Sequence, residues 1–220
     1  KYSDKFEQVS IDEAFLDVTD KVKDYEEAEK LAERIKKEIL NKEKVSSSIG
    51  IGPNKLIAKL ASDYKKPYGT TVVKPEDIKR FLYPLPVRKL IGVGPKTEAV
   101  LKEMKIETVE QLAKSDVKNL VDVFGIFGYR MHEMALGIDE SEVIEEYEVK
   151  SIGRETTFEE DVDNQKIIIA AIDKLVDEFH PEIIASGISF KTIGIKIRYE
   201  NFEAPTHAKT FEFHTNDKQI

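Results

Sequence analysis

Two adjacent carboxylates, Asp12 and Glu13, are the residues of this chain best suited to chemistry. Two anions held so close repel each other unless a cation lies between them. A hard divalent ion such as Mg²⁺ prefers oxygen ligands of this kind, and it could neutralise a triphosphate and support in-line phosphoryl transfer. The alternative is a solvated acidic turn that has no chemical role.

The pattern around the pair predicts the element that positions it. Apolar residues alternate through Val9–Val18, as they do in a half-buried strand. Asp12 and Glu13 are therefore expected at a tight turn or strand end, fixed to a rigid sheet. The residues expected to be buried are Val9, Ile11, Ala14, Leu16 and Val18.

Strands and helices alternate through residues 6–73, which is typical of an α/β or α+β domain. A helix is expected over residues 24–43, with Asp24 as its N-cap and a solvated outer face of Glu and Lys. A strand over Val45–Ile51, a helix over Asn54–Tyr64 and a strand over Thr70–Val73 are expected to follow.

Lysines gather on and after the helix expected at Asn54–Tyr64. They are Lys55, Lys59, Lys65 and Lys66. One interpretation is a phosphate clamp that faces Asp12 and Glu13. The other is a solvated helix face, with basic residues near the C-terminus where they favour the helix dipole.

Residues 74–139 predict a small all-helical region with a glycine hairpin. Gly92, Val93 and Gly94 precede Pro95, a residue suited to the first helical turn, and Thr97 follows in that turn. Glycine allows close approach of the backbone, and free N–H groups at a helix start can bind a phosphate oxygen without reading base sequence. An ordinary turn between two helices is the alternative.

The remainder divides into an acidic linker, 140–150, and a small α+β unit, 151–220. A strand is expected at Ser151–Phe158, a helix at Gln165–His180 that Pro181 stops, a strand around Ile193–Tyr199 and another at Lys209–Phe213. Basic side chains on one sheet face could follow a phosphate backbone, or they could be an ordinary polar face. They are Arg154, Lys196 and Arg198.

The composition narrows the class of protein. The 220 residues are 40% hydrophobic and 35% charged, which predicts a soluble globular chain, and they contain no Cys, which excludes disulfides and thiolate metal sites. No stretch is typical of a signal peptide or a membrane span, so a cytoplasmic location and no membrane partner are expected. The net charge of −8, concentrated after residue 139, predicts only modest non-specific affinity for DNA.

Five short motifs in one order resemble the Y-family DNA polymerases of the DinB type, which copy damaged templates. The matching motifs are Ser10-Ile11-Asp12-Glu13-Ala14, Gly50-Ile51-Gly52-Pro53-Asn54-Lys55, Lys66-Pro67-x-Gly69, Ile91-Gly92-Val93-Gly94 and Ser151-Ile152-Gly153-Arg154. Each motif alone is weak, but five in register identify the chain as similar to this family along nearly its whole length.

The resemblance implies an α+β multidomain fold. Residues 1–73 correspond to a partial palm with an α/β sheet, 74–139 to an all-α helix-hairpin-helix thumb, 140–150 to the linker, and 151–220 to a partial α+β little finger. The family's first palm strand, with a further metal-binding aspartate and the aromatic residue that excludes ribonucleotides, matches no stretch here. The chain is therefore expected to be a fragment of a longer polymerase that binds DNA weakly and does not extend it.

The resemblance also implies roles for single residues. Asp12 and Glu13 would be catalytic and metal-binding, and Lys66 would contact the incoming triphosphate. The residues expected to contact DNA are Lys55, Lys59, Gly92, Val93, Gly94, Thr97, Ser151, Gly153, Arg154, Lys196 and Arg198.

The implied activity is template-dependent, low-fidelity translesion synthesis with two Mg²⁺ ions. The implied partners are primer-template DNA, deoxynucleoside triphosphates and a sliding clamp, and the expected oligomeric state is a monomer. A non-catalytic helix-hairpin-helix DNA-binding module is the main alternative. A metal-dependent nuclease is a further one, which the order of the motifs disfavours.

Overall fold

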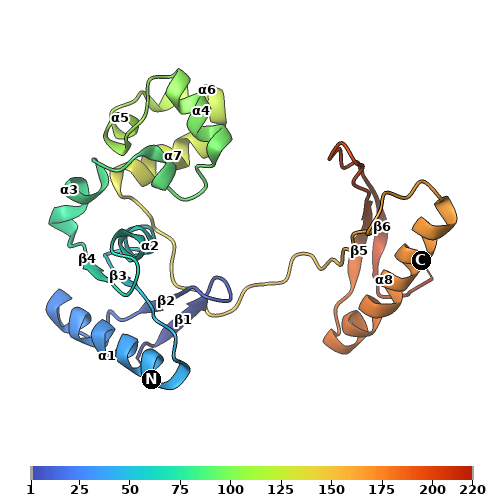
Figure 1. Cartoon of the computed structure of the whole chain (residues 1–220), viewed down its shortest axis with the longest axis horizontal. Coiled ribbons are helices and arrows are strands. Elements are labelled where there is room, and N and C mark those ends of the chain that lie inside the picture. Colours follow the sequence, from blue (N-terminus) through green and yellow to red (C-terminus); the bar gives the residue numbers. More distant parts are fainter. Residues whose placement is uncertain (1, 220) are drawn as a thin grey trace. The chain divides into compact units, whose positions relative to one another are not determined.

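The computed structural model describes residues 2–219, which form two compact units (Figure 1). The first unit extends to Tyr147 and the second begins at Glu148. None of the helices described in residues 2–219 is long and apolar enough to cross a membrane.

An antiparallel hairpin opens the first unit. Strands β1 (Lys5–Gln8) and β2 (Ala14–Asp17) pair with Phe6 opposite Leu16, and residues 9–13 form the connection. Of the strand region expected over Val9–Val18, Ala14–Asp17 forms a strand, and most of the burial predicted for this region is wrong. Ile11 is 99% exposed because it lies at the tip of this connection, and the residues that are exposed with it are Val9, Ala14 and Leu16.

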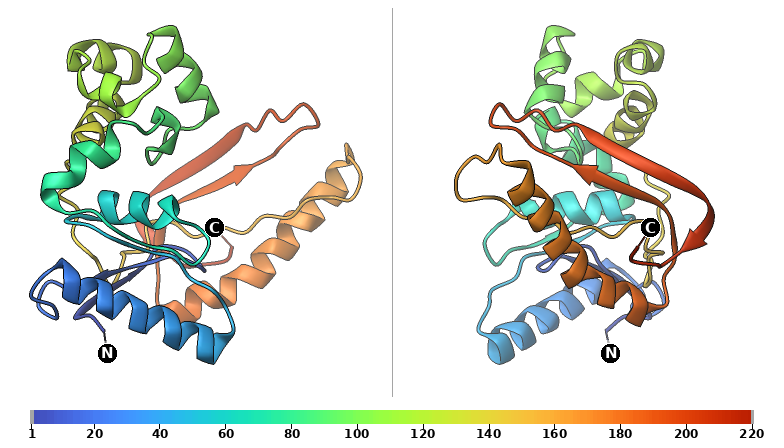
Figure 2. Two further views of the ribbon diagram at one scale, coloured as in Figure 1. Left: turned by 60° about the vertical axis from the view of Figure 1, so that its left-hand side comes forward. Right: turned by 90° about the vertical axis from the view of Figure 1, so that its right-hand side faces the viewer.

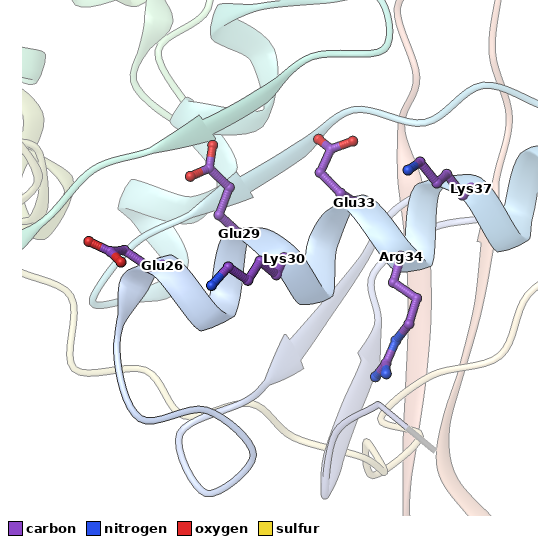
Figure 3. A pocket seen from close by; sticks show the side chains of 6 residues that line it. All are labelled: Glu26, Glu29, Lys30, Glu33, Arg34 and Lys37. Carbon is purple, nitrogen blue, oxygen red and sulfur yellow. The ribbon is translucent and has the colours of Figure 1, made fainter.

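Helix α1 (Tyr25–Glu43) begins as predicted at Asp24, whose carboxylate accepts hydrogen bonds from the N–H groups of Glu26 and Glu27. Its inner face buries Ala28, Ala32 and Lys36. Figure 3 shows six charged side chains on its outer side: Glu26, Glu29, Lys30, Glu33, Arg34 and Lys37. They line a shallow surface depression of mixed charge, as expected for a solvated helix face.

Helix α2 (Lys55–Tyr64) connects the parallel strands β3 (Ile49–Ile51) and β4 (Thr70–Val72). The predicted strand from Val45 begins only at Ile49, and β3–β4 is a sheet separate from β1–β2 among the described residues. Figure 2 shows α2 above these strands and α1 below them. Gly50 allows α2 to lie close on β3, since a Cβ there would be 1.9 Å from the Ala58 carbonyl oxygen.

Residues 75–136 form a helical region, as predicted. Its elements are η1 (Pro75–Asp77), α3 (Ile78–Leu82), η2 (Val87–Lys89), α4 (Pro95–Glu103), α5 (Val109–Ala113), α6 (Val117–Phe124) and α7 (Ile126–Leu136). Gly128 lies inside α7. There a Cβ would be 2.1 Å from the Leu120 carbonyl oxygen, so glycine permits the close packing of α6 on α7.

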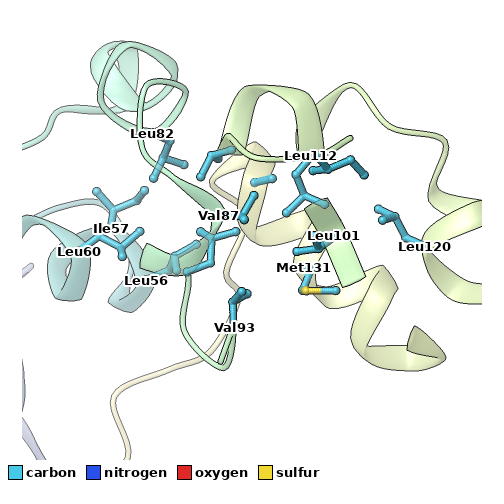
Figure 4. Packing of buried hydrophobic residues seen from close by; sticks show 14 of the residues in the cluster. Leu56, Ile57, Leu60, Leu82, Val87, Val93, Leu101, Leu112, Leu120 and Met131 are labelled. Carbon is cyan, nitrogen blue, oxygen red and sulfur yellow. The ribbon is translucent and has the colours of Figure 1, made fainter. Parts of the chain in front are cut away.

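One hydrophobic core joins α2 to this helical region (Figure 4). Leu56 and Ile57 of α2 are in the same cluster as Leu82, Leu101 and other buried side chains of the helical region. The cluster continues without a break across residue 73, which the sequence suggested as a domain boundary. The helix that carries the lysines is therefore packed as part of this core.

The chain after α7 packs back onto the first unit. The Asp139 carboxylate accepts a hydrogen bond from Leu56 N–H (2.9 Å), and the Asn54 side chain donates to the Gly137 carbonyl (2.9 Å), so both secure the start of α2. The Ile144 N–H and the Tyr147 hydroxyl donate to the buried carboxylate of Glu7. The expected linker 140–150 is therefore corrected: residues up to 147 are held against β1 and α2.

The second unit contains α8 (Gln165–Ser186) and an antiparallel pair, β5 (Phe190–Lys196) and β6 (Thr206–Thr215). Two predictions are corrected. Helix α8 continues through Pro181, since a proline removes only one helical hydrogen bond and the next turn still buries Ile183. Ser151–Phe158 forms no strand, because in the described chain β5 and β6 pair only with each other.

The apolar side chains of β5 are more exposed than predicted. The sequence suggested a half-buried strand, yet Ile193 and Ile195 are 41% and 44% exposed. Within residues 148–219 the buried hydrophobic side chain is Ile183, so little packing covers the two strands.

Candidate active site

The connection between β1 and β2 holds the two carboxylates. The N–H groups of Val9 and Ser10 donate to the Glu13 carbonyl (3.0 and 3.2 Å), which closes the turn. The Ser10 hydroxyl donates to Asp12 Oδ1 at 2.6 Å, and that hydrogen bond, together with the charges of Lys66 and Lys59, holds the pKa of Asp12 below its ordinary value. The prediction that Asp12 and Glu13 lie at a turn is confirmed. The Asp12 carboxylate is ionised and exposed, so its oxygens are accessible to a cation.

Two lysines of the predicted clamp lie beside these carboxylates. Lys59 of α2 forms an ion pair with Glu13 and lies 3.5 Å from Asp63, and Lys66 pairs with Asp63 at 2.5 Å. Burial alone would lower the pKa of Lys59, but Glu13 and Asp63 raise it above its ordinary value. The result is a chain of alternating charge from the hairpin turn to the turn after α2.

A cavity of about 1240 Å³ lies along this row of charges. Asp12, Glu13, Lys59 and Lys66 are among its polar lining residues, and apolar side chains of β2, α1 and the segment before β3 line another part of it. A polar edge on an apolar wall suits a ligand that has both charged and flat apolar parts.

Lys55 faces away from the two carboxylates. Its ammonium bonds both oxygens of Glu7 (2.8 and 2.6 Å) and lies 5.2 Å from the Phe15 ring centre. Only 16% of its side chain is exposed. The structure therefore places Lys55 in an internal ion pair with Glu7, and its contact with DNA stays a prediction.

Glu7 is a structural residue beside the candidate site that the sequence reasoning missed. Burial alone would raise its pKa, but hydrogen bonds from Lys55, Tyr147 and the Ile144 N–H outweigh that effect and lower it. Its carboxylate therefore stays ionised and joins three segments far apart in the sequence.

The glycine hairpin before α4 has the geometry the sequence suggested. Gly92 has a φ of +84°, which a side chain would strain, and Phe127 lies against it. Gly94 precedes α4 with open space around it, and Val93 is buried, so its side chain faces the core. Within the described residues no side chain caps α4, so the N–H groups of Lys96 and Thr97 in its first turn have no capping side chain.

The residues of the second unit that were predicted to contact DNA differ in their exposure and in their contacts within the chain. Arg154 forms an ion pair with Glu182 and lies 5.9 Å from the Phe179 ring centre, so it is folded onto α8. Ser151 and Gly153 are exposed in an extended segment, and Lys196 and Arg198 are exposed at the end of β5 and just after it.

Comparison with known proteins places these features in a family. The sequence model of the impB/mucB/samB family matches residues 1–63, that of its C-terminal domain matches 149–220, and that of the IMS family HHH motif matches 75–106. DNA polymerase IV 2 of Methanosarcina mazei is 43% identical over 216 residues, which are 98% of this chain and 58% of that protein. The chain belongs to the DinB-like Y family of DNA polymerases.

Other relatives in this Y family agree. DNA polymerase IV of Streptococcus agalactiae is 40% identical over 220 residues, which are 100% of this chain and 60% of that protein. Among solved structures, a Y-family DNA polymerase chimera of Dbh and Dpo4 matches with a TM-score of 0.88 and 28% identity, over 99% of this chain and 63% of that one. DinB of Sulfolobus solfataricus matches with a TM-score of 0.63 and 28% identity, over 99% and 64%.

The Y-family chain described here spans about three fifths of the length of the curated relatives it matches. The residues matched by the family models include both carboxylates, Lys55 and Lys59 of α2, the glycine hairpin and residues 149–220.

Proposed function

We propose that this chain is the part of a translesion DNA polymerase that holds the carboxylates of its nucleotidyl-transfer site. The observation that carries the proposal is Asp12, ionised and exposed at the tip of a rigid hairpin and facing the lysines at 59 and 66. The relatives are named DNA polymerase IV, and one similar structure is described as an insertion ternary complex of Dbh DNA polymerase. A template-dependent polymerase of low fidelity, acting on primer-template DNA and deoxynucleoside triphosphates, accounts for these features together.

Asp12 and Glu13 offer the hard oxygen donors that Mg²⁺ prefers, so the residues present fit the expected metal. Among the described residues no cluster of three or more acidic, His or Cys side chains could hold a metal, so these two form only part of such a site. When bound, Mg²⁺ would neutralise triphosphate charge and make the primer 3′-hydroxyl more acidic.

The side chains around the carboxylates would share the remaining work. Ser10 keeps Asp12 in the ionised form that binds cations. Lys66, 54% exposed, can leave Asp63 for a phosphate oxygen, since an exposed ion pair contributes little. Lys59 holds Glu13 in place beside Asp12.

The glycine hairpin and the second unit would hold the DNA backbone. The uncapped start of α4 offers N–H groups to a phosphate, a contact that is independent of base sequence. Lys196 and Arg198 add exposed positive charge. In this proposal residues 1–73 act as part of a palm, 74–139 as a thumb and 151–220 as part of a little finger.

We expect the 220 residues alone to bind primer-template DNA weakly and not to extend it. Two-metal transfer needs a set of carboxylates that bridges both ions, and this chain brings two of them together. Charge neutralisation and positioning would then both be incomplete.

The test is primer extension with Mg²⁺ and four deoxynucleoside triphosphates, on undamaged and abasic templates. It compares this chain with a protein completed to the relatives' length by the segments it does not span in DNA polymerase IV 2 of Methanosarcina mazei. We expect extension, including past the abasic site, only from the completed protein, and loss of at least about 10³-fold in its Asp12→Ala variant. An unchanged rate in the Asp12→Ala variant would contradict the proposal.

The second candidate is a non-catalytic DNA-binding module, which the uncapped start of α4 and the open Gly94 favour. It predicts that both proteins retard DNA in a gel while neither extends a primer. Adding a side chain at the hairpin, as in Gly94→Val, would weaken that binding in either case.

A further inference from the structure

Lys36 is a charged side chain buried on the inner face of α1. Its side chain is 3% exposed on the inner face of α1, and burial of an unpaired ammonium is strongly unfavourable. Its partners come from the turn after α2 and from its own helix. The ammonium lies 3.0 Å from Glu33 Oε1 and 3.0 Å from Thr70 Oγ1, and 4.3 Å from the centre of the Tyr68 ring.

Tyr68, in the turn after α2, has an unfavourable backbone conformation. Its φ is +60°, in the left-handed region, which is unfavourable for a large side chain. A cation over a tyrosine ring is attractive, and more so where water is excluded. Lys36 therefore stabilises the one backbone conformation in which the ring lies over its ammonium.

The same turn carries Lys66. Residues 65–69 run from the end of α2 to β4, and the Gly69 carbonyl accepts a hydrogen bond from Ile49 N–H at 3.0 Å, which begins the pairing of β3 with β4. Lys66, Pro67 and Tyr68 line the same cavity as Asp12 and Glu13. The conformation at Tyr68 thus determines where the turn places Lys66 along the cavity.

We propose that Lys36 is a positioning residue for nucleotide binding: its buried ammonium fixes Tyr68 and, through it, the turn that presents Lys66 to the triphosphate. The role assigned to Lys66 rests on the proposed function. The role assigned to Lys36 in the turn rests on the contacts of Lys36 with Tyr68, Thr70 and Glu33.

The test of the turn is amide hydrogen exchange of the whole chain at Ile49, whose N–H reports whether the Gly69 carbonyl is in place. We expect Lys36→Met to speed exchange at Ile49 about tenfold, with no change at Leu60 in the core of α2. Lys37→Met, which removes an exposed charge from the next residue of α1, is the matched control and should leave Ile49 unchanged.

Rescue separates positioning from a general loss of stability. Asparagine adopts the left-handed conformation with little strain, so Tyr68→Asn in the Lys36→Met background should restore slow exchange at Ile49. If Lys36→Met does not fold, Tyr68→Leu provides the test, because it removes the ring and leaves the ion pair; it too should speed exchange at Ile49. Unchanged exchange at Ile49 in these variants, or failure of the rescue, would overturn the proposal.

A second readout addresses the triphosphate. Addition of Mg²⁺ and dATP to the wild-type chain should shift the amide signals of Lys66 and Gly69, and Lys36→Met should weaken that binding about tenfold. If the wild-type chain shows no shifts, the role proposed for Lys66 fails, while the exchange measurement still decides whether Lys36 fixes the turn. Equal dATP affinity in the wild type and Lys36→Met would overturn the link between Lys36 and nucleotide binding.

Discussion

The two units differ in how their residues are held in place. Among the described residues the buried hydrophobic side chains lie in the first unit, with Ile183 as the exception. The first unit contains the carboxylates and the lysines, which must be placed to within about 1 Å for chemistry. The second unit offers exposed groups suited to a repeating phosphate backbone, where such accuracy is not required. Close packing thus coincides with α2, the helix that carries Lys59, whereas the candidate backbone contacts of the second unit are sparsely packed.

The sharpest way to break this comparison is to remove equal side-chain volume from each unit. Leu101→Ala should destabilise the first unit by about 3 kcal/mol, because Leu101 is fully buried in the core. Ile193→Ala should change the stability of the second unit by less than about 0.5 kcal/mol, because Ile193 is already 41% exposed. Amide exchange measured separately in the two units checks both values, and similar losses would show that the contrast is false.

Glu7→Gln removes the charge that joins β1, α2 and the segment ending at Tyr147. It should destabilise the first unit by about 2 kcal/mol, because Lys55 is left largely buried without a charged partner. Urea denaturation of the first unit measures the loss. Glu142→Gln is the matched control, since its exposed ion pair with Lys5 contributes less than about 0.5 kcal/mol. Equal effects of the two variants would contradict the role given to Glu7.

The same contact predicts a pH dependence. The pKa of Glu7 is lower in the folded chain than in the unfolded one, so its ionised form stabilises the fold. That contribution is fully present above the ordinary glutamate pKa of about 4.3 and disappears as the pH falls through the lower folded value. The difference in urea midpoint between wild type and Glu7→Gln should shrink below about pH 4, and a difference that grows there would contradict this sign.

Pro181→Ala is a substitution in the second unit that is expected to stabilise it. Since α8 continues through Pro181, restoring the missing N–H should stabilise that unit by about 1 kcal/mol. Pro95→Ala is the control, because proline is favourable in the first turn of α4 and its removal should give no gain. Amide exchange along α8 provides the measurement, and slower exchange is the expected result.

The smallest expected effect is at the carboxylates. Ser10→Ala removes the hydrogen bond to Asp12, so the pKa of Asp12 should rise towards its ordinary value. A titration followed by NMR of the Asp12 side chain measures this rise. Ser115→Ala, far from the site in the sequence, should leave the Asp12 titration unchanged.

The features that were predicted correctly are those determined by interactions between residues close in the sequence. The start of α1 at Asp24, that of α2 after Asn54 and the hairpin at Gly92 depend on caps and glycine conformations visible in a few residues. The position of Asp12 and Glu13 at a turn, next to Lys59 and near Lys66, also followed from spacing and family resemblance.

What was missed depends on distant parts of the chain. Ile11 was expected to be buried because apolar residues alternate through residues 9–18. The pairing of β1 with β2, which the sequence does not reveal, places Ile11 in the exposed connection between the two strands. Lys55 was counted with the exposed lysines, since nothing nearby in the sequence reveals that Glu7 and Tyr147 meet at its ammonium. Lys36 and Glu7 look like ordinary surface charges in a sequence, and their burial is decided by tertiary packing alone.

The start of α2 has a consequence for how the protein is made. Its stabilising contacts with Gly137 and Asp139 join residues 83 positions apart. At about 5–20 residues per second, a ribosome needs roughly 4–17 s to add that many residues. During translation, α2 therefore lacks these contacts until the chain has been synthesised through Asp139.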